Sequence, residues 1–131
     1  FNPKIDEEAL LCPMIDARRM EVYSAIYDRA LQQILPIEAN IIDENSFSDI
    51  LKERKVVFFG DGAEKCKEVI KSENAIFLTG VVPLAKSMLA LSERALRNQD
   101  FKDTAYYQPF YLKEFQATTP KNKVLNNLSN K

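Results

Sequence analysis

The sequence contains no histidine and no tryptophan, and it has three glycines and two cysteines in 131 residues. Histidine is the commonest general base and the commonest zinc ligand. Its absence excludes the usual serine or cysteine triad and a histidine-based metalloprotease site within this sequence. Cys12 and Cys66 are too few for a disulfide framework and have no metal-ligand spacing. The two thiols therefore indicate a reducing, cytoplasmic setting.

An excess of one charge is also missing. The 18 basic and 19 acidic side chains give a net charge of -1, so no overall field marks a binder of nucleic acid or membranes. No apolar run approaches the roughly 20 residues that cross a bilayer. The first residue is Phe1 rather than Met, which predicts that this is a piece of a longer protein.

What is present is an α/β pattern. Short apolar, β-branched and aromatic runs predict three consecutive strands, at 13–17, 21–27 and 34–42. Pro36 favours the sheet edge for the third, because proline donates no ladder hydrogen bond. The rest alternates, with helices expected at 45–54, 63–72 and 83–98 and strands at 55–59 and 74–79. This order predicts a ribonuclease H-like lobe with a mixed sheet of about five strands, three antiparallel and then two parallel, flanked by helices.

Local signals refine the three helices. Ser46 followed by Asp49 predicts a capping box at the start of the first helix. In the second helix, Cys66 and its apolar neighbours are expected to point inward. In the third, the stripe that includes Leu84 and Met88 recurs at helical spacing and is interpreted as core.

Composition divides the chain into four parts, namely a truncated N-terminal arm (1–12), the lobe (13–99), an aromatic-rich segment (100–119) and a flexible polar tail (120–131). The aromatic residues of the third part either pack on their own sheet or meet a missing domain or partner, since so much exposed apolar surface is unusual for a stable monomer. Residues 101–131 carry five lysines and two acids. This excess indicates either a solvated tail or contact with RNA phosphates.

The stretch "VVFFGDGAEKC" raises the question of a phosphate site. A strand, the turn Gly60-Asp61-Gly62 and a helix follow one another, as in many anion-binding loops. The turn is short and lacks both the P-loop and the dinucleotide-binding glycine patterns. Asp61 would also repel a phosphate in the absence of a metal. We therefore interpret the turn as structural, with glycines needed for its backbone angles, and we assign no cofactor to it.

Three carboxylates allow a parallel hypothesis. Clustered acids serve two-metal nucleases of this fold class, and Asp16, Glu21 and Asp61 are the candidates. Arg18 and Arg19 follow Asp16 directly, so an ion pair or a hydrogen bond within the hairpin explains this acid without chemistry. We assign no catalytic residue and no metal ligand, and we interpret Cys66 as a small core residue.

Two segments resemble a known family. "PMIDARRMEVYSAIYD" (13–28) carries the Asp16-Ala17-Arg18 pattern and then Glu21-Val22-Tyr23, and "YYQPFYLKEFQATTPKNK" (106–123) has a proline, an aromatic residue and then Tyr111-Leu112. Both resemble the second half of the bacterial TsaB (YeaZ) proteins, once labelled glycoproteases or peptidase family M22. The resemblance covers most of residues 11–123 and is specific at its two ends.

The resemblance implies a fold and a function. Such proteins have two ribonuclease H-like halves of the actin-like ATPase superfamily, and this chain looks like the C-terminal half. They are non-catalytic subunits that dimerise with the catalytic TsaD subunit and work with the ATPase TsaE to add threonylcarbamoyl to the tRNA adenosine next to the anticodon. The tRNA would be met indirectly, through the complex. A homodimer of the isolated fragment would then be a consequence of truncation. The alternative is the second lobe of an ATPase or sugar kinase with a nucleotide contact at Gly60–Gly62.

Overall fold

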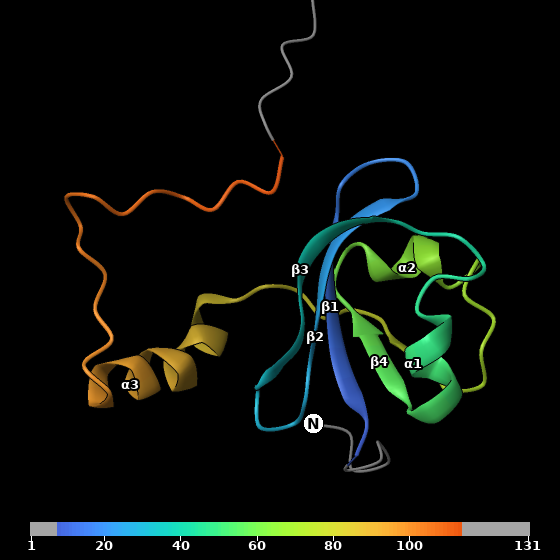
Figure 1. Ribbon diagram of the computed structural model, residues 1–131, viewed down its shortest axis with the longest axis horizontal. Helices are drawn as coiled ribbons and strands as arrows, with labels where there is room; N and C mark the ends of the chain where they lie inside the picture. The colour runs from blue at the N-terminus through green and yellow to red at the C-terminus, as the bar shows by residue number, and fades with distance from the viewer. Residues whose placement is uncertain (1–7, 114–131) are drawn as a thin grey trace, which may run out of the picture.

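The computed structural model describes residues 8–113, which form one mixed sheet with helices on both sides (Figure 1). The strands lie in the order β3-β2-β1-β4-β5. Their bounds are Leu10–Asp16 (β1), Glu21–Tyr27 (β2), Gln33–Ile41 (β3), Val56–Phe59 (β4) and Ala75–Leu78 (β5). The helical elements are α1 (Ser48–Glu53), α2 (Ala63–Cys66), the short 3-10 helix η1 (Ala85–Met88) and α3 (Leu89–Arg97).

The pairing of the strands confirms the predicted sheet. β1 pairs antiparallel with β2, and β2 pairs antiparallel with β3. On its other side β1 pairs parallel with β4, which pairs parallel with β5. The edge position of β3, expected from Pro36, is confirmed as well. The sheet is thus a meander joined through β1 to a β-α-β unit.

The core lies between the sheet and the helices α1 and α2. Alternate residues of β1 and β2 point to this face and are almost fully buried, as the pleat of a strand requires. They pack with Leu51 of α1 and with Ala63 and Cys66 of α2 in one cluster. Phe58 of β4 stacks on Phe77 of β5, with 5.1 Å between the ring centroids. Figure 1 shows both helices on this side of the sheet.

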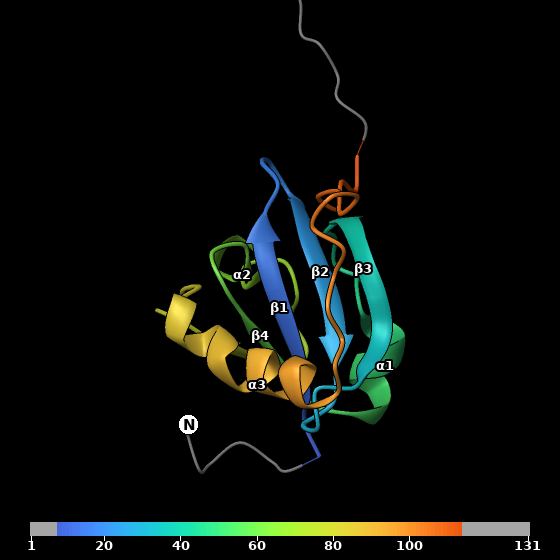
Figure 2. The same cartoon turned by 90° about the vertical axis from the view of Figure 1, so that its left-hand side faces the viewer.

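The opposite face of the sheet is only partly covered. Ile15 of β1 is 61% exposed and Ile41 of β3 is 76% exposed. Figure 2 shows α3 and the chain that follows it on this side of the sheet. No residue of α3 is buried. The last described elements therefore stand over this face without sealing it.

Several boundaries differ from those predicted. β1 begins at Leu10, so that residues 10–12, expected in the N-terminal arm, open the central strand. α2 ends at Cys66, and the residues after it form turns. Ile70 is buried as expected, but it lies in a turn after the helix, where its backbone N–H donates a hydrogen bond to Cys66 O. An amphipathic spacing does not by itself determine the length of a helix this short.

The predicted capping box is wrong. The residue before α1 is Phe47, which has φ 61° in the left-handed region. The Ser46 hydroxyl accepts the Asp43 N–H at 2.8 Å and donates to the Asp43 carboxylate at 2.9 Å. Ser46 therefore closes the turn before the helix, because its side chain reaches back along the chain rather than forward to the first helical amides.

The third predicted helix is present in two pieces and is not core. η1 and α3 together cover 85–97, whereas Pro83 and Leu84 precede the helical residues. Leu84 and Leu91 are each 46% exposed. A regular apolar stripe shows which side of a helix will be covered, but it does not show whether the covering surface belongs to the same chain.

Candidate functional site

The turn between β4 and α2 is pressed against the end of β1. Gly60 has φ +103°, and a Cβ atom built on it would lie 2.2 Å from the Met14 carbonyl oxygen. A Cβ on Gly62 would lie 3.0 Å from a methyl carbon of Val22. Gly60 is therefore required by its backbone angle and by close packing of backbone on backbone. Gly62 has φ -80°, so the prediction that its backbone angle needs glycine is wrong, and a Cβ there would only make a tight contact. The interpretation of this turn as a structural feature has a direct geometric basis.

Two backbone amides at this turn are already engaged. Gly62 N–H donates to Met14 O at 3.1 Å, and Ala63 N–H donates to Gly60 O at 3.2 Å. An anion-binding helix N-terminus needs amides that point outward at the ligand. α2 spans only Ala63–Cys66, so it also contributes little dipole. Nothing in this geometry forms a phosphate cradle.

Asp61 points back to the sheet. Its carboxylate accepts a hydrogen bond from the Asp16 backbone N–H at 3.0 Å. This bond satisfies an amide at the end of β1, where the parallel ladder with β4 stops at Pro13 and Phe59. The carboxylate that would repel a phosphate thus serves to hold the turn against β1.

Asp16 is the centre of a small polar cluster. Its carboxylate accepts the Arg18 N–H at 2.9 Å and forms an ion pair with the Lys65 ammonium group. The hydrogen bond from Lys65, and then that from Arg18, lower the pKa of Asp16 below its ordinary value. Lys65 also donates to Glu21 O at 2.7 Å. One lysine of α2 thereby ties the end of β1 to the start of β2 at the hairpin turn.

The predicted hairpin hydrogen bond to Asp16 is confirmed, but its ionic partner is Lys65 rather than Arg18 or Arg19. Both arginines have positive φ, 73° and 50°, in the tight turn after β1. Sequence reasoning did not single out Lys65. No local signal marked it, because its partners Asp16 and Glu21 come from β1 and β2, 49 and 44 positions away in sequence.

The three candidate carboxylates do not converge on one point. Asp61 bonds to backbone, Asp16 pairs with Lys65, and Glu21 pairs with Lys113. Across residues 8–113, no group of three or more His, Cys, Asp or Glu side chains has an arrangement that would hold a metal ion. Asp16 and Asp61 fasten the hairpin and the turn, whereas Glu21 joins the start of β2 to Lys113 beyond α3.

Both cysteines are core residues. Cys12 and Cys66 are free thiols with no exposed surface. Burial raises the pKa of Cys12 to about 12, and burial also raises the pKa of Cys66. The Cys66 thiol donates to Gly62 O at 3.2 Å. The inward orientation expected for Cys66 is confirmed, and a protonated, buried thiol is a poor nucleophile.

An exposed apolar surface is the second candidate site. We call it the C-terminal apolar surface. It combines residues in or directly before η1 and α3 with the aromatic residues that follow, all of them 46% exposed or more: Leu84, Met88, Leu89, Leu91, Leu96, Phe101, Tyr106, Tyr107, Phe110 and Tyr111. The interpretation in which these aromatics pack on their own sheet is wrong for the described residues. Phe115 lies outside them.

Comparison with known proteins gives a likeness of fold. No protein-family model and no curated protein sequence matches this chain. Among solved structures, the chain is similar to an uncharacterized protein with similarity to peptidase YeaZ from Pseudomonas aeruginosa, with a TM-score of 0.63 and 19% identity. The match covers 79% of this chain and 49% of that protein, so the chain spans about half its length. The fold is therefore YeaZ-like.

The described helices also bear on the expectation about membranes. Within residues 8–113, no helix is long and apolar enough to cross a bilayer.

Proposed function

We propose that this chain is the C-terminal half of a YeaZ (TsaB)-type subunit, a non-catalytic partner in the complex that adds threonylcarbamoyl to the tRNA adenosine next to the anticodon. The YeaZ-like fold supports this proposal. So does the signature in residues 13–28 that resembles the TsaB proteins. The setting would be cytoplasmic.

The observation that carries a non-catalytic role is the state of the Gly60–Gly62 turn. The Gly62 N–H and the Asp61 carboxylate bond to β1, and the Ala63 N–H that follows bonds to Gly60 O. A lobe that bound ATP at this turn would have to break those bonds to free donors for the phosphates. The turn is better suited to fixing the shape of the lobe than to binding a nucleotide.

The C-terminal apolar surface supports a role in assembly. Exposed apolar patches of this kind mark sites of protein contact. In this proposal the first half of the subunit covers part of that surface, and a TsaD-like catalytic subunit and a TsaE-like ATPase complete the assembly. The tRNA is then reached through the complex.

A chimera tests the proposal. This chain would be joined behind the first half of a characterised TsaB protein and expressed in cells depleted of their own TsaB. We expect the chimera to co-purify with the TsaD-type subunit and to restore threonylcarbamoyladenosine in tRNA. A folded chimera that neither binds that subunit nor restores the modification would overturn the proposal.

Titration of the same chimera with ATP and magnesium tests the kinase or ATPase alternative. We expect no saturable binding at this lobe. Saturable binding that changes the amide chemical shifts of Gly60 and Gly62 in this lobe would favour the alternative. The spectrum of the chimera without ATP provides the reference. A titration of the first half alone shows which part of any binding belongs to that lobe.

A further inference from the structure

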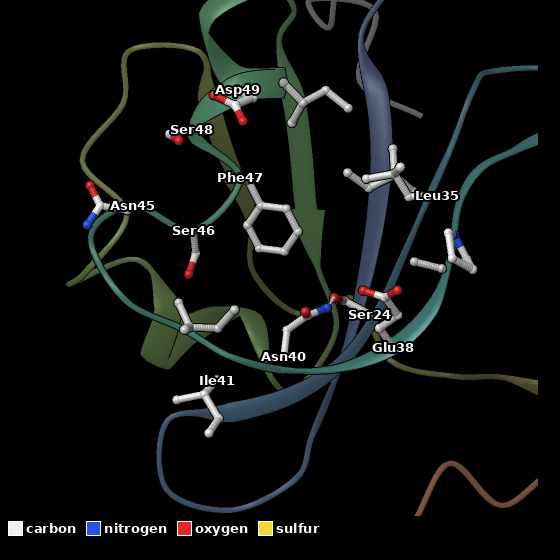
Figure 3. A pocket seen from close by; sticks show the side chains of 15 residues that line it. Ser24, Leu35, Glu38, Asn40, Ile41, Asn45, Ser46, Phe47, Ser48 and Asp49 are labelled. Atoms are coloured by element: carbon white, nitrogen blue, oxygen red, sulfur yellow. Dashed lines mark hydrogen bonds between the residues drawn. The ribbon is translucent and has the colours of Figure 1, made fainter.

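A groove opens between the edge strand β3 and the start of α1. Its volume is about 430 Å³, and its lining comes from β2, from β3 and from residues 45–50. Figure 3 shows Phe47 in the middle of this groove, with Asn40 and Glu38 on the strand across from it. Asn40 donates to the Ser24 hydroxyl at 3.0 Å. The groove thus has an aromatic floor and a polar wall that is part of a strand.

The wall is also a free sheet edge. One side of β3 pairs with β2, and within residues 8–113 no strand pairs with the other. Ile37 is 40% exposed on this nine-residue strand. Long, apolar edges are unusual in natural sheets unless something covers them. Pro36 has no N–H, so the stretch able to pair without interruption is 37–41.

The groove and the edge lie in the most acidic part of the sequence. Between Ala30 and Leu51 there are four acids, Glu38, Asp43, Glu44 and Asp49, and no lysine or arginine. Asp49 pairs with Lys52 at 3.0 Å. Glu38 lines the groove and forms no ion pair with any residue that the structure describes. The chemistry of the wall therefore complements a cation.

We propose that β3 binds an extended, cationic peptide segment of a partner protein by strand addition. The peptide backbone pairs with residues 37–41, an apolar side chain enters the groove over Phe47, and a lysine or arginine of the peptide pairs with Glu38. Backbone pairing provides affinity, and alternate side chains provide specificity. This surface is separate from the Gly60–Gly62 turn, and the inference does not depend on the proposed function.

The charge pattern favours such a peptide over a second copy of the chain. Pairing β3 with its own copy would bring together two strands whose one charged residue is the acid Glu38, each followed closely by Asp43 and Glu44. Like charges facing across a strand pair are unfavourable. A cationic strand has the opposite effect.

The test uses the full chain and a defined probe, the capped peptide Lys-Val-Lys-Val-Thr-Val-Lys. Its matched control has every lysine replaced by glutamate. Binding is followed by the backbone amide resonances of the protein at low ionic strength. We expect shifts and slowed hydrogen exchange at residues 37–41. The glutamate peptide should bind at least about tenfold more weakly, as loss of a charge-assisted contact predicts.

Protein variants locate the contact. Glu38→Gln should weaken binding of the lysine peptide about tenfold. The matched control Glu73→Gln, an exposed acid next to the opposite edge strand, should leave it unchanged. Urea midpoints of both variants are measured to establish that they remain folded. Methylation of alternate peptide nitrogens should remove binding if the backbone pairs, and leave it intact if only side chains make contact.

Any one of five results would overturn the inference. Three of them are equal binding of the two peptides, an unchanged affinity in Glu38→Gln, and shifts confined to residues outside β3 and α1. The fourth is full binding of the N-methylated peptide, which would exclude backbone pairing. The fifth is a dimer of the chain alone whose 37–41 amides are already protected from exchange, which would assign the edge to a second copy.

Discussion

The Asp61 carboxylate accepts a hydrogen bond from the backbone N–H of Asp16, with 3.0 Å between the two atoms. The two residues lie 45 positions apart in sequence, at the ends of adjacent parallel strands. In such sheets ligands commonly bind outside the carboxyl ends of the strands. Here that position is occupied by a contact within the chain, together with the Gly62 N–H bond to Met14 O. The end of the sheet is sealed by its own turn.

Replacing Gly60 by alanine should destabilise the lobe severely. The added Cβ would lie 2.2 Å from the Met14 carbonyl oxygen, at a φ of +103° that side chains rarely adopt. We expect a loss of about 3 kcal/mol in the free energy of unfolding, measured by urea denaturation.

Gly80 provides the matched control. It also has positive φ, +73°, but a Cβ there would meet nothing within 4 Å. Gly80→Ala should cost about 1 kcal/mol, from backbone strain alone. Equal losses at the two positions would show that packing against β1 contributes nothing at Gly60.

The Asp16–Lys65 ion pair should make the stability of the lobe depend on pH in the acid range. The pKa of Asp16 is lowered from 3.8 in the folded state, so the unfolded chain takes up the proton first as pH falls. The stabilisation is therefore complete above pH 3.8 and is lost as pH falls through the lowered value. We expect Asp16→Asn to be less stable than the parent at neutral pH, and the difference to shrink in acid.

Direct titration of the carboxyl resonance checks the cause. Lys65→Met should move the pKa of Asp16 up toward its ordinary value, because the hydrogen bond from Lys65 is the largest contribution to the shift. Lys52→Met is the control, since Lys52 pairs with Asp49 instead. An Asp16 pKa that is the same in Lys65→Met and in the parent would rule out the ion pair in solution.

The two thiols should be protected in the native protein. Burial raises the pKa of Cys12 from 9.0 to about 12, and the thiolate is the reactive form. At a pH of about 8 we expect labelling by a disulfide reagent to be at least about a hundredfold slower than in denaturant. Above pH 9 the unfolded state ionises first, so Cys12 should make stability fall as pH rises. Rapid native labelling of either cysteine would contradict the buried positions.

Charges placed on the C-terminal apolar surface should leave the lobe stable. Met88, Leu89 and Leu96 are each 62–63% exposed, so Leu89→Glu or Leu96→Glu should change the free energy of unfolding by no more than about 0.5 kcal/mol. By contrast Leu51→Ala, at a residue 4% exposed, should cost about 3 kcal/mol. Urea denaturation of the three variants provides the comparison.

The same glutamate variants should fail when carried into the chimera. A carboxylate in a buried interface is costly, so we expect weaker association and less modified tRNA. Full activity with both glutamates in place would mean that the surface stays exposed in the assembly.

The sheet was predictable from sequence because each strand is a short apolar run with turn residues on both sides. Pro36 marked the edge, and the order of the elements determined which pairs are parallel. The helices were less predictable. The Ser46 side chain could bond either forward to the first helical amides or back to Asp43, and its sequence position does not decide between them. The spacing of Cys66 and Ile70 fits a helix as well as the turn that is found. For Leu84 and Leu91, pattern identified the apolar side but contained no information on the surface that covers it.

The site was predictable in kind rather than in detail. The absence of the phosphate-binding patterns and the presence of Asp61 indicated a structural turn at Gly60–Gly62. The contact with Asp16 could not be deduced, because it depends on the register of β1 against β4, which no local signal specifies. Lys65 escaped notice for the same reason, since its partners come from β1 and β2.

The position of β1 has a consequence for the way the chain is made. This strand is synthesised first of the five, yet one of its neighbours, β4, emerges only after α1. A nascent chain that has reached Ile42 can form the β1–β2–β3 meander, but that meander exposes unpaired backbone groups along β1 as well as along β3. In the complete sheet the two edges are β3 and β5, whereas a protein truncated between β3 and β4 would expose the central strand β1 as an edge and should aggregate. The shortest product in which β1 has a neighbour on both sides ends after Phe59.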